Sequence, residues 1–424
     1  MEEESVQNNS FQCYYNWTEH QSEVLQSTEY MLEGPGSLII GIGGILINFL
    51  AIFVILKSDL KSSFFYWLLI CLEVFDSSFL GCCVLESFRK HIGTVSIHNL
   101  VFANFLFPFK SVVMLCSIYT AIALSVERYN ALVNPVSHRS LRAANAVDAN
   151  LNNHLKRLLK YMGPILLICV TFYIPRFFEV KAFKVDCKEQ VNTTNCSSDY
   201  KLNITELRRS DNYVLWYINI LNLIVTCAIP LISILYLNCR VYFGLRQYLK
   251  RKPSFLSTAT MKSPRHLDTP TKQIKETQRA DKVQQTMTLF GIIIVFCICH
   301  SLRVFMNIEE LVNVENIRQS IKNNCTPWSF SLMIIVPISE TLLQINCSIN
   351  FFVYCAINKR FKEVALGYVR SIFGLKKKSN LSQAMSRKET ITNRSRTNTD
   401  QQKIKIETQE TQDVGVPLLK IDYC

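Results

Sequence analysis

The sequence predicts an all-α membrane protein, a seven-transmembrane helix bundle with a short amphipathic eighth helix. Three observations support this fold class. Hydrophobic residues make up 49% of the 424 residues and charged residues only 19%, which is unusual for a soluble globular protein. Seven apolar segments have the length that crosses a bilayer as a helix, about 20 residues each. Basic residues gather on alternate connectors between these segments, which neither a disordered chain nor a nucleic-acid binder would require.

The first predicted span, residues 37–56, has 20 residues and no charge. It is too long and too far from the N-terminus for a signal peptide. The fourth span is short, contains Pro164 and ends before Pro175. The bundle is expected to occupy residues 37–357, with the other spans near 64–85, 100–126, 158–174, 213–237, 287–305 and 328–357. The flanking parts are an extracellular N-terminal tail (1–36), amphipathic helix 8 on the inner leaflet (358–374) and a cytoplasmic tail (375–424).

The net charge of +13 is unevenly distributed along the chain. Residues 1–36 contain seven acidic residues and no lysine or arginine. The connectors after spans one, three and five, and the chain that leaves span seven, are rich in lysine and arginine. Because these residues accumulate in short cytoplasmic loops, we expect a multi-pass protein of the plasma membrane with its N-terminus outside.

Glycosylation sequons and cysteines agree with this orientation. Six sequons fall on the predicted outer side, at Asn8, Asn16, Asn192, Asn195, Asn203 and Asn324. Four cysteines fall there as well, in an oxidising environment, and allow three disulfide connectivities. We favour the pairing Cys187–Cys196 with Cys13–Cys325. No cysteine and histidine spacing indicates a zinc site.

Several polar residues lie within or at the ends of the apolar spans. Asn48 and Asp76 are in spans one and two, Glu127 and Arg128 are at the inner end of span three, and span seven ends in Asn346 to Tyr354. Such groups are costly in a membrane unless they face one another in the bundle, so each is a candidate functional residue. A glutamate–arginine pair at a helix end could also be a simple interface anchor.

Together these residues resemble the rhodopsin-type (class A) family of G-protein-coupled receptors, over residues 36 to 373. Glu127-Arg128-Tyr129 resembles the family's D/E-R-Y motif, and Asn350 to Tyr354 resembles N-P-x-x-Y. Pro230 matches the helix-five proline. The resemblance implies coupling to a heterotrimeric G protein through a switch formed by Glu127, Arg128, Tyr129, Pro230, Asn350 and Tyr354.

The chain departs from the family pattern in several places. Phe351 replaces the proline of N-P-x-x-Y, the tryptophan and proline of helix six are missing, and no cysteine stands at the top of helix three. In these places it is similar to invertebrate receptors of the FMRFamide and myosuppressin type, to which Cys299 to Arg303 and Asn307 to Glu309 correspond. This similarity implies a neuropeptide ligand, RF-amide-like, whose arginine needs a carboxylate.

The expected ligand site contains a lysine within span three. Lys110 lies five helical turns outward from Arg128, where a receptor for amines would need an aspartate. Span seven has no lysine for retinal, whereas lipid ligands stay open. Lys110 needs an acidic partner among Glu73, Glu86, Glu309, Glu310 and Glu340, and a Lys110–Glu340 pair could be structural or could receive a peptide. The candidate ligand-binding residues are Lys110, His300, Arg303, Glu340 and Gln344.

The resemblance also implies an internal sodium pocket, formed by Asp76, Ser117, Asn346 and Asn350. A hydrogen-bonded polar core without an ion is the alternative, and no other cofactor is expected. The expected partners are an extracellular peptide, a G protein, arrestin and membrane lipid, with no nucleic acid. A seven-span transporter or channel, or an orphan receptor with constitutive or lost signalling, is the alternative function; no motif indicates an enzyme.

Overall fold

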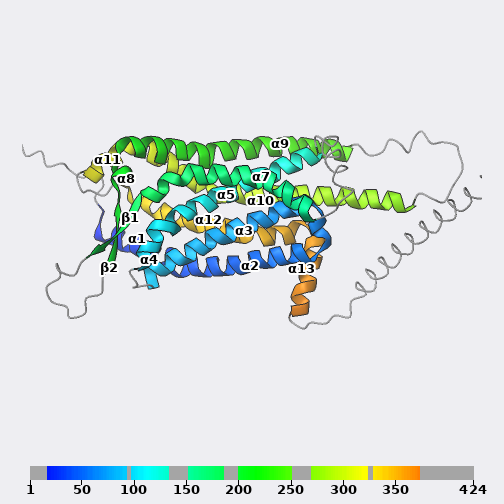
Figure 1. Ribbon diagram of the computed structural model, residues 1–424, viewed down its shortest axis with the longest axis horizontal. Helices are drawn as coiled ribbons and strands as arrows, with labels where there is room; N and C mark the ends of the chain where they lie inside the picture. Colours follow the sequence, from blue (N-terminus) through cyan, green and yellow to red (C-terminus); the bar gives the residue numbers. More distant parts are fainter. Residues whose placement is uncertain are drawn as a thin grey trace, which may run out of the picture. The chain divides into compact units, whose positions relative to one another are not determined.

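The computed structural model describes residues 17–92, 97–132, 151–185, 199–250, 269–322 and 328–372 (Figure 1). Among these residues, seven helices are long and apolar enough to cross a membrane. They span Glu19–Lys57, Phe64–His91, Ile97–Leu132, His154–Phe178, Tyr213–Gln247, Ala280–Val312 and Phe330–Ile357. We number them one to seven. The fold class expected from the sequence is therefore confirmed.

Within these spans the regular α-helices alternate with short irregular turns. Helix one contains α1 (Glu19–Met31) and α2 (Ser37–Lys57), helix two α3 (Phe64–Ser87), and helix three α4 (Ile97–Val101) and α5 (Phe107–Leu132). Helix four is α7 (Leu151–Tyr173), helix five ends in α9 (Ile229–Lys250), helix six is α10 (Thr269–Val312) and helix seven is α12 (Phe330–Ile357). The shorter elements are α8 (Glu206–Arg209), α11 (Val314–Lys322), α13 (Lys359–Ile372), β1 (Val180–Val185) and β2 (Asp199–Ile204).

Helix one begins 18 residues before the span expected at residue 37, within the segment expected to be a tail. Thr18 and Gln21 form a capping box: the Thr18 hydroxyl accepts from Gln21 N at 3.2 Å and the Gln21 side chain accepts from Thr18 N at 3.0 Å. Pro35 lies in a π-helical turn, Leu32–Gly36, that joins α1 to α2. The Gly34 carbonyl in this turn accepts a hydrogen bond from the Ser87 hydroxyl at 3.1 Å.

The core of the bundle lies where α3 packs against α2, α5 and α12. A buried cluster joins helices two, three and seven through Phe79, Leu80, Cys83, Val113, Leu343 and Cys347. Helix one approaches this core closely at Gly44, where a Cβ atom would collide with the side chains of Ser348 and Leu80. Glycine is therefore required at Gly44 by the packing of α2 on α3 and α12.

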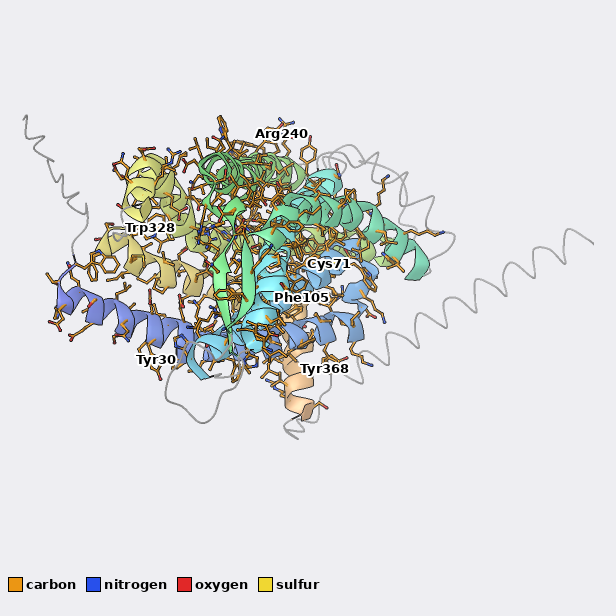
Figure 2. All side chains as sticks on the ribbon, turned by 60° about the vertical axis from the view of Figure 1, so that its left-hand side comes forward. Tyr30, Cys71, Phe105, Arg240, Trp328 and Tyr368 are labelled. Carbon is orange, nitrogen blue, oxygen red and sulfur yellow. The ribbon has the colours of Figure 1, made fainter. Side chains whose placement is uncertain are left out.

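Large apolar side chains cover the outward faces of the helices. Tyr30 and Phe105 are both more than half exposed (Figure 2). Such a surface would be unfavourable in water and suits the hydrocarbon of a bilayer. Other exposed apolar residues are Ile39, Leu46, Phe49, Leu159, Leu167, Ile232, Tyr236, Ile294 and Ile298.

An antiparallel hairpin lies between helices four and five, in the connector that contains three of the sequons. Its register runs from Val180 opposite Ile204 to Val185 opposite Asp199. The Asn99 amide of α4 donates to the Tyr200 carbonyl of β2 at 2.8 Å, and both strands contact α4. The hairpin thereby attaches the connector between helices four and five to helix three through a hydrogen bond and packing. Figure 1 places it at the same end of the bundle as α4, α8 and α11.

The ends of several helices differ from the expected spans, and helix five continues to Gln247. Helix six runs as one α-helix from Thr269 to Val312, well beyond residues 287–305. The additional turns are polar, so an apolar segment in the sequence does not mark them. Helix three continues to Leu132 and helix four begins at Leu151. The amphipathic α13 begins directly after Asn358, whose side chain accepts from Phe361 N at 3.1 Å.

Candidate functional site

We call the half of the bundle that the charge distribution predicts to be extracellular the outer half, and the opposite end the inner end. The outer half contains a chain of ion pairs centred on helix three. The Lys110 ammonium lies 2.9 Å from a Glu86 carboxylate oxygen and 3.2 Å from one of Glu340. The other oxygen of Glu340 lies 2.6 Å from the Arg303 guanidinium. Helices two, three, six and seven are thereby joined by charge. The pair of Lys110 with Glu340 is present, and Glu86 approaches Lys110 more closely still.

The chain continues outward to helix one. Lys90 lies 3.6 Å from Glu86 and 2.7 Å from Glu33, which belongs to the π-helical turn. Three acids and three bases thus alternate across five helices. The order is Glu33, Lys90, Glu86, Lys110, Glu340 and Arg303. A charged ligand entering this region would have to replace one of these existing partners.

The other two candidate ligand residues lie beside this chain of charges. His300 is buried on α10 and stacks on Phe296, with 4.1 Å between ring centroids. Gln344 faces helix one, where its side-chain oxygen accepts from the Ser37 hydroxyl at 3.1 Å. The structure therefore brings Lys110, Arg303 and Glu340 into direct contact and leaves His300 and Gln344 next to them.

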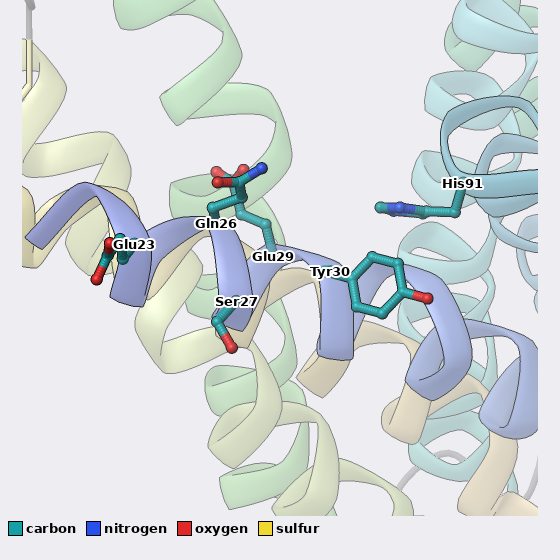
Figure 3. A pocket seen from close by; sticks show the side chains of 6 residues that line it. All are labelled: Glu23, Gln26, Ser27, Glu29, Tyr30 and His91. Carbon is teal, nitrogen blue, oxygen red and sulfur yellow. The ribbon is translucent and has the colours of Figure 1, made fainter. Parts of the chain in front are cut away.

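A pocket of about 440 Å³ opens where α1 faces the outer end of helix two (Figure 3). The Tyr30 and His91 rings meet edge to face there, 5.5 Å apart. Sequence reasoning missed this pocket because residues 1–36 were expected to be a tail, although Thr18 and Gln21 carry the spacing of a helix N-terminus. Its lining residues are Glu23, Gln26, Ser27, Glu29, Tyr30 and His91.

A polar cluster lies around Asp76 in the middle of the bundle. One Asp76 oxygen accepts from the Ser117 hydroxyl at 2.6 Å and the other from the Asn350 amide at 2.8 Å. The Asn48 amide donates to the Cys347 carbonyl at 2.9 Å, and Asn346 is half-buried nearby on α12. The contacts described for this cluster, which we call the Asp76 core, are hydrogen bonds, and Asn350 turns its amide nitrogen toward Asp76. Among the described residues no group of three or more histidine, cysteine or acidic side chains could hold a metal.

Glu73 is a member of this core that the sequence placed elsewhere. It was considered as a partner for Lys110, together with Glu309 and Glu310, and the structure pairs Lys110 with none of the three. Glu73 instead accepts a hydrogen bond from the Tyr354 hydroxyl at 2.5 Å. No periodicity in the sequence could distinguish Glu73 from Glu86, because the choice depends on how helix two is rotated in the bundle.

The inner end of the bundle is closed around Arg128. Its guanidinium donates to the Gln285 side-chain oxygen of α10 at 2.5 Å and lies over the Phe65 ring, 4.4 Å from the centroid. Glu127 lies 3.7 Å from Arg128 and accepts from Arg157 of α7 at 2.8 Å. Arg128 is thus buried between helices two, three and six, where a G protein could not reach it.

Two further residues expected to belong to a switch, Tyr129 and Pro230, lie at helix five or against it. Tyr129 packs against a buried cluster of Leu132, Val241 and Leu245, which joins α5 to α9. Pro230 is buried at the second position of α9, directly after a π-helical turn, Ile224–Ala228. Proline lacks a backbone N–H, so a widened turn before it is the expected local distortion.

The cysteines and most sequons proposed from the sequence lie outside the described residues. These are Cys13, Cys187, Cys196, Cys325, Asn8, Asn16, Asn192, Asn195 and Asn324. Asn203 is described: it is exposed on β2, and its side-chain oxygen accepts a long hydrogen bond of 3.4 Å from Arg209.

The family to which the chain belongs follows from a match over residues 47–354 to the 7 transmembrane receptor (rhodopsin family) model. This match covers well over half of the chain, so the chain belongs to the rhodopsin family of seven-transmembrane receptors. Membership of a receptor family agrees with the expectation that the chain is not an enzyme, and it does not favour a transporter or channel.

The chain is also similar to the FMRFamide receptor of Drosophila melanogaster, with 23% identity over 336 residues. The alignment covers 77% of this chain and 52% of that receptor, so the chain spans about half the length of this relative. This relative is an FMRFamide receptor, the type of receptor that Cys299 to Arg303 of helix six also resemble.

Proposed function

We propose that this protein is a plasma-membrane receptor for an RF-amide-like neuropeptide, with its N-terminus outside, that transmits binding to a heterotrimeric G protein. The observation that carries the ligand proposal is the position of Glu340 between Lys110 and Arg303. A carboxylate held by two cations at the outer end of the bundle is a site that a peptide arginine can enter by exchange. The similarity to an FMRFamide receptor supports this ligand class.

The transmission step uses helix six. A ligand guanidinium that binds Glu340 bidentately would displace Arg303, which belongs to α10. Once α10 loses this contact, its inner end, which carries Gln285, is free to move away from Arg128. The ligand thereby favours the open one of two conformations of the bundle. In the open conformation Arg128 becomes accessible to the C-terminal helix of a G protein.

The remaining partners follow from the orientation. Lysine and arginine on the inner connectors and on α13 would face anionic lipid. Serine and threonine residues between Ser254 and Thr271, and after Ser379, would recruit arrestin once phosphorylated. We propose that no cofactor is needed and that the Asp76 core works through its hydrogen bonds, since a sodium ion would require Asn350 to turn away.

The ligand proposal is tested by screening amidated peptides on cells that express the full chain, with calcium and cyclic AMP as readouts. An Arg-Phe-amide peptide should give a response. Glu340→Gln should raise the peptide concentration that gives the half-maximal response by about tenfold or more, since a lost charge contact contributes about 1.4 kcal/mol or more. Glu363→Gln is the matched control, because this glutamate is exposed on α13 at the inner side. Equal potency on both variants, or ion flux without a G-protein response, would contradict the proposal.

A further inference from the structure

Glu73 is an acidic residue that is fully buried. It lies on α3 with no exposed surface. Its Oε1 atom accepts from the Tyr354 hydroxyl, whereas its Oε2 atom has no hydrogen-bond partner among the described residues. An ionised carboxylate in this position would therefore leave one charged oxygen both dry and unsatisfied, which is among the most costly arrangements in a protein interior.

A second carboxylate lies one helical turn away. Asp76 is three residues further along α3 and only 1% exposed, so the two acids are neighbours on one face of the helix, about 5–6 Å apart at Cβ. Their surroundings differ. Both oxygens of Asp76 accept a hydrogen bond, from Ser117 and from Asn350. Asp76 therefore has the environment of a stabilised anion, and Glu73 does not.

Among the described residues, no ion pair joins Glu73 to the helices around it. The cations of α5 and α7 on this side are Arg128 and Arg157, which contact Glu127 and lie over Phe65 and Phe64 at the inner end of α3. Phe65 is eight residues from Glu73, about 12 Å along the helix axis.

The remaining neighbours of Glu73 are neutral or distant. From α2 the nearest polar group is the Asn48 amide, and α12 contributes Tyr354 and the Cys347 thiol. On α3 itself the Tyr66 hydroxyl accepts from Asn358. At the outer end Lys110 pairs with Glu86, thirteen residues from Glu73 or about 20 Å along the axis.

We propose that Glu73 is a proton-binding site of the closed bundle. A proton taken from water resides on Oε2, Tyr354 continues to donate to Oε1, and Asp76 keeps the single negative charge. Glu73 is thus a positioning residue: as a neutral acid it holds Tyr354, and with it the inner end of α12, against α3. Two buried carboxylates in such proximity do not both ionise, and the one with fewer donors takes the proton.

The site is linked to signalling if the proposed receptor function holds. When α12 releases Tyr354 and water enters from the inner side, the desolvation that keeps Glu73 neutral is removed, and the proton can leave. The closed state then binds one proton more than the open state. Acid at the inner face should therefore favour the closed state, by at most about tenfold per pH unit.

Infrared spectroscopy of the purified full-length protein in lipid nanodiscs tests whether Glu73 is protonated. This measurement needs neither ligand nor G protein. Wild type should show the carbonyl stretch of a protonated carboxylic acid that shifts when glutamate is labelled with carbon-13 in its side-chain carboxyl. This band should be absent from Glu73→Gln, which conserves the shape of the side chain. A band that survives in Glu73→Gln, a band that does not shift with labelled glutamate, or no such band would overturn the proposal.

The coupling is tested in the same nanodiscs, where both faces meet one buffer. Ligand-independent nucleotide exchange on a G protein should rise from acid to alkaline buffer with wild type and with the control Glu363→Gln. With Glu73→Gln, which is permanently neutral, it should stay low and lose that dependence. The same pH dependence in all three proteins would overturn the coupling. Failure of the receptor function alone would abolish exchange and leave the infrared band intact.

Discussion

Arg128 is held at the inner end of the bundle by a neutral amide. Gln285 accepts from its guanidinium at 2.5 Å and donates to the Ser63 hydroxyl at 3.4 Å, so one side chain of α10 is bonded to helices two and three. A hydrogen bond to a charged group contributes about 1.5–3 kcal/mol. The side chain of Gln285 therefore contributes much of the free energy that stabilises the closed state at this end.

Gln285→Ala should raise ligand-independent signalling by about tenfold or more, because it removes that bond from the closed state only. Cyclic AMP or calcium signalling at equal surface expression measures the effect. Gln284→Ala is the matched control, since Gln284 is the adjacent glutamine on the same turn of α10, whereas the hydrogen bond from Arg128 goes to Gln285. Unchanged basal signalling in Gln285→Ala would show that the closure depends on other contacts.

At the residue scale, sequence reasoning identified the types of group and one pair, Lys110 with Glu340, but not the second partner of Lys110. The motif pattern singled out Arg128, Asp76 and Tyr354, and the mid-membrane lysine pointed to a carboxylate partner. It could not separate Glu86 from Glu73, since both lie on the same span and only the rotation of helix two decides which faces Lys110 and which faces Tyr354.

The packing of helix one on helices two and seven depends on one of two adjacent glycines. A Cβ atom at Gly44 would collide with Ser348 and Leu80, whereas one at Gly43 would meet nothing within 4 Å. Gly44→Ala should therefore destabilise the protein by about 1–3 kcal/mol, as overpacked cores do. Gly43→Ala should be neutral or slightly stabilising.

Thermal unfolding of the two purified variants measures this difference. Equal unfolding temperatures for Gly43→Ala and Gly44→Ala would mean that helix one can move away from the core without cost, against the close approach described here.

Elements were predictable where composition and periodicity coincide. The apolar spans gave the number and order of the helices, and the amphipathic pattern gave α13. The outer half of helix one was missed because α1 is polar. The hairpin was missed although polar and apolar residues alternate along β2, because each strand has only six residues and its packing depends on α4. The helical turns beyond the membrane, as in α10, carry no apolar signal at all.

At the scale of the whole molecule, the bundle has one set of polar contacts at each end, and no side chain belongs to both sets. Alternating charges join helices one, two, three, six and seven on the outer side, and the contacts of Arg128 join helices two, three and six on the inner side. Helix six takes part in both, through Arg303 and Gln285. In the proposed function, movement of this single α-helix would couple a ligand at the outer end to a partner at the inner end.

The most direct test of this coupling is nucleotide exchange on a purified heterotrimeric G protein, with the full-length receptor in nanodiscs and an Arg-Phe-amide peptide that activates it in cells. The peptide should accelerate exchange with wild type and not with Arg128→Ala, while both proteins bind the peptide with similar affinity. Acceleration that persists in Arg128→Ala, or peptide binding to wild type without any acceleration, would contradict the account.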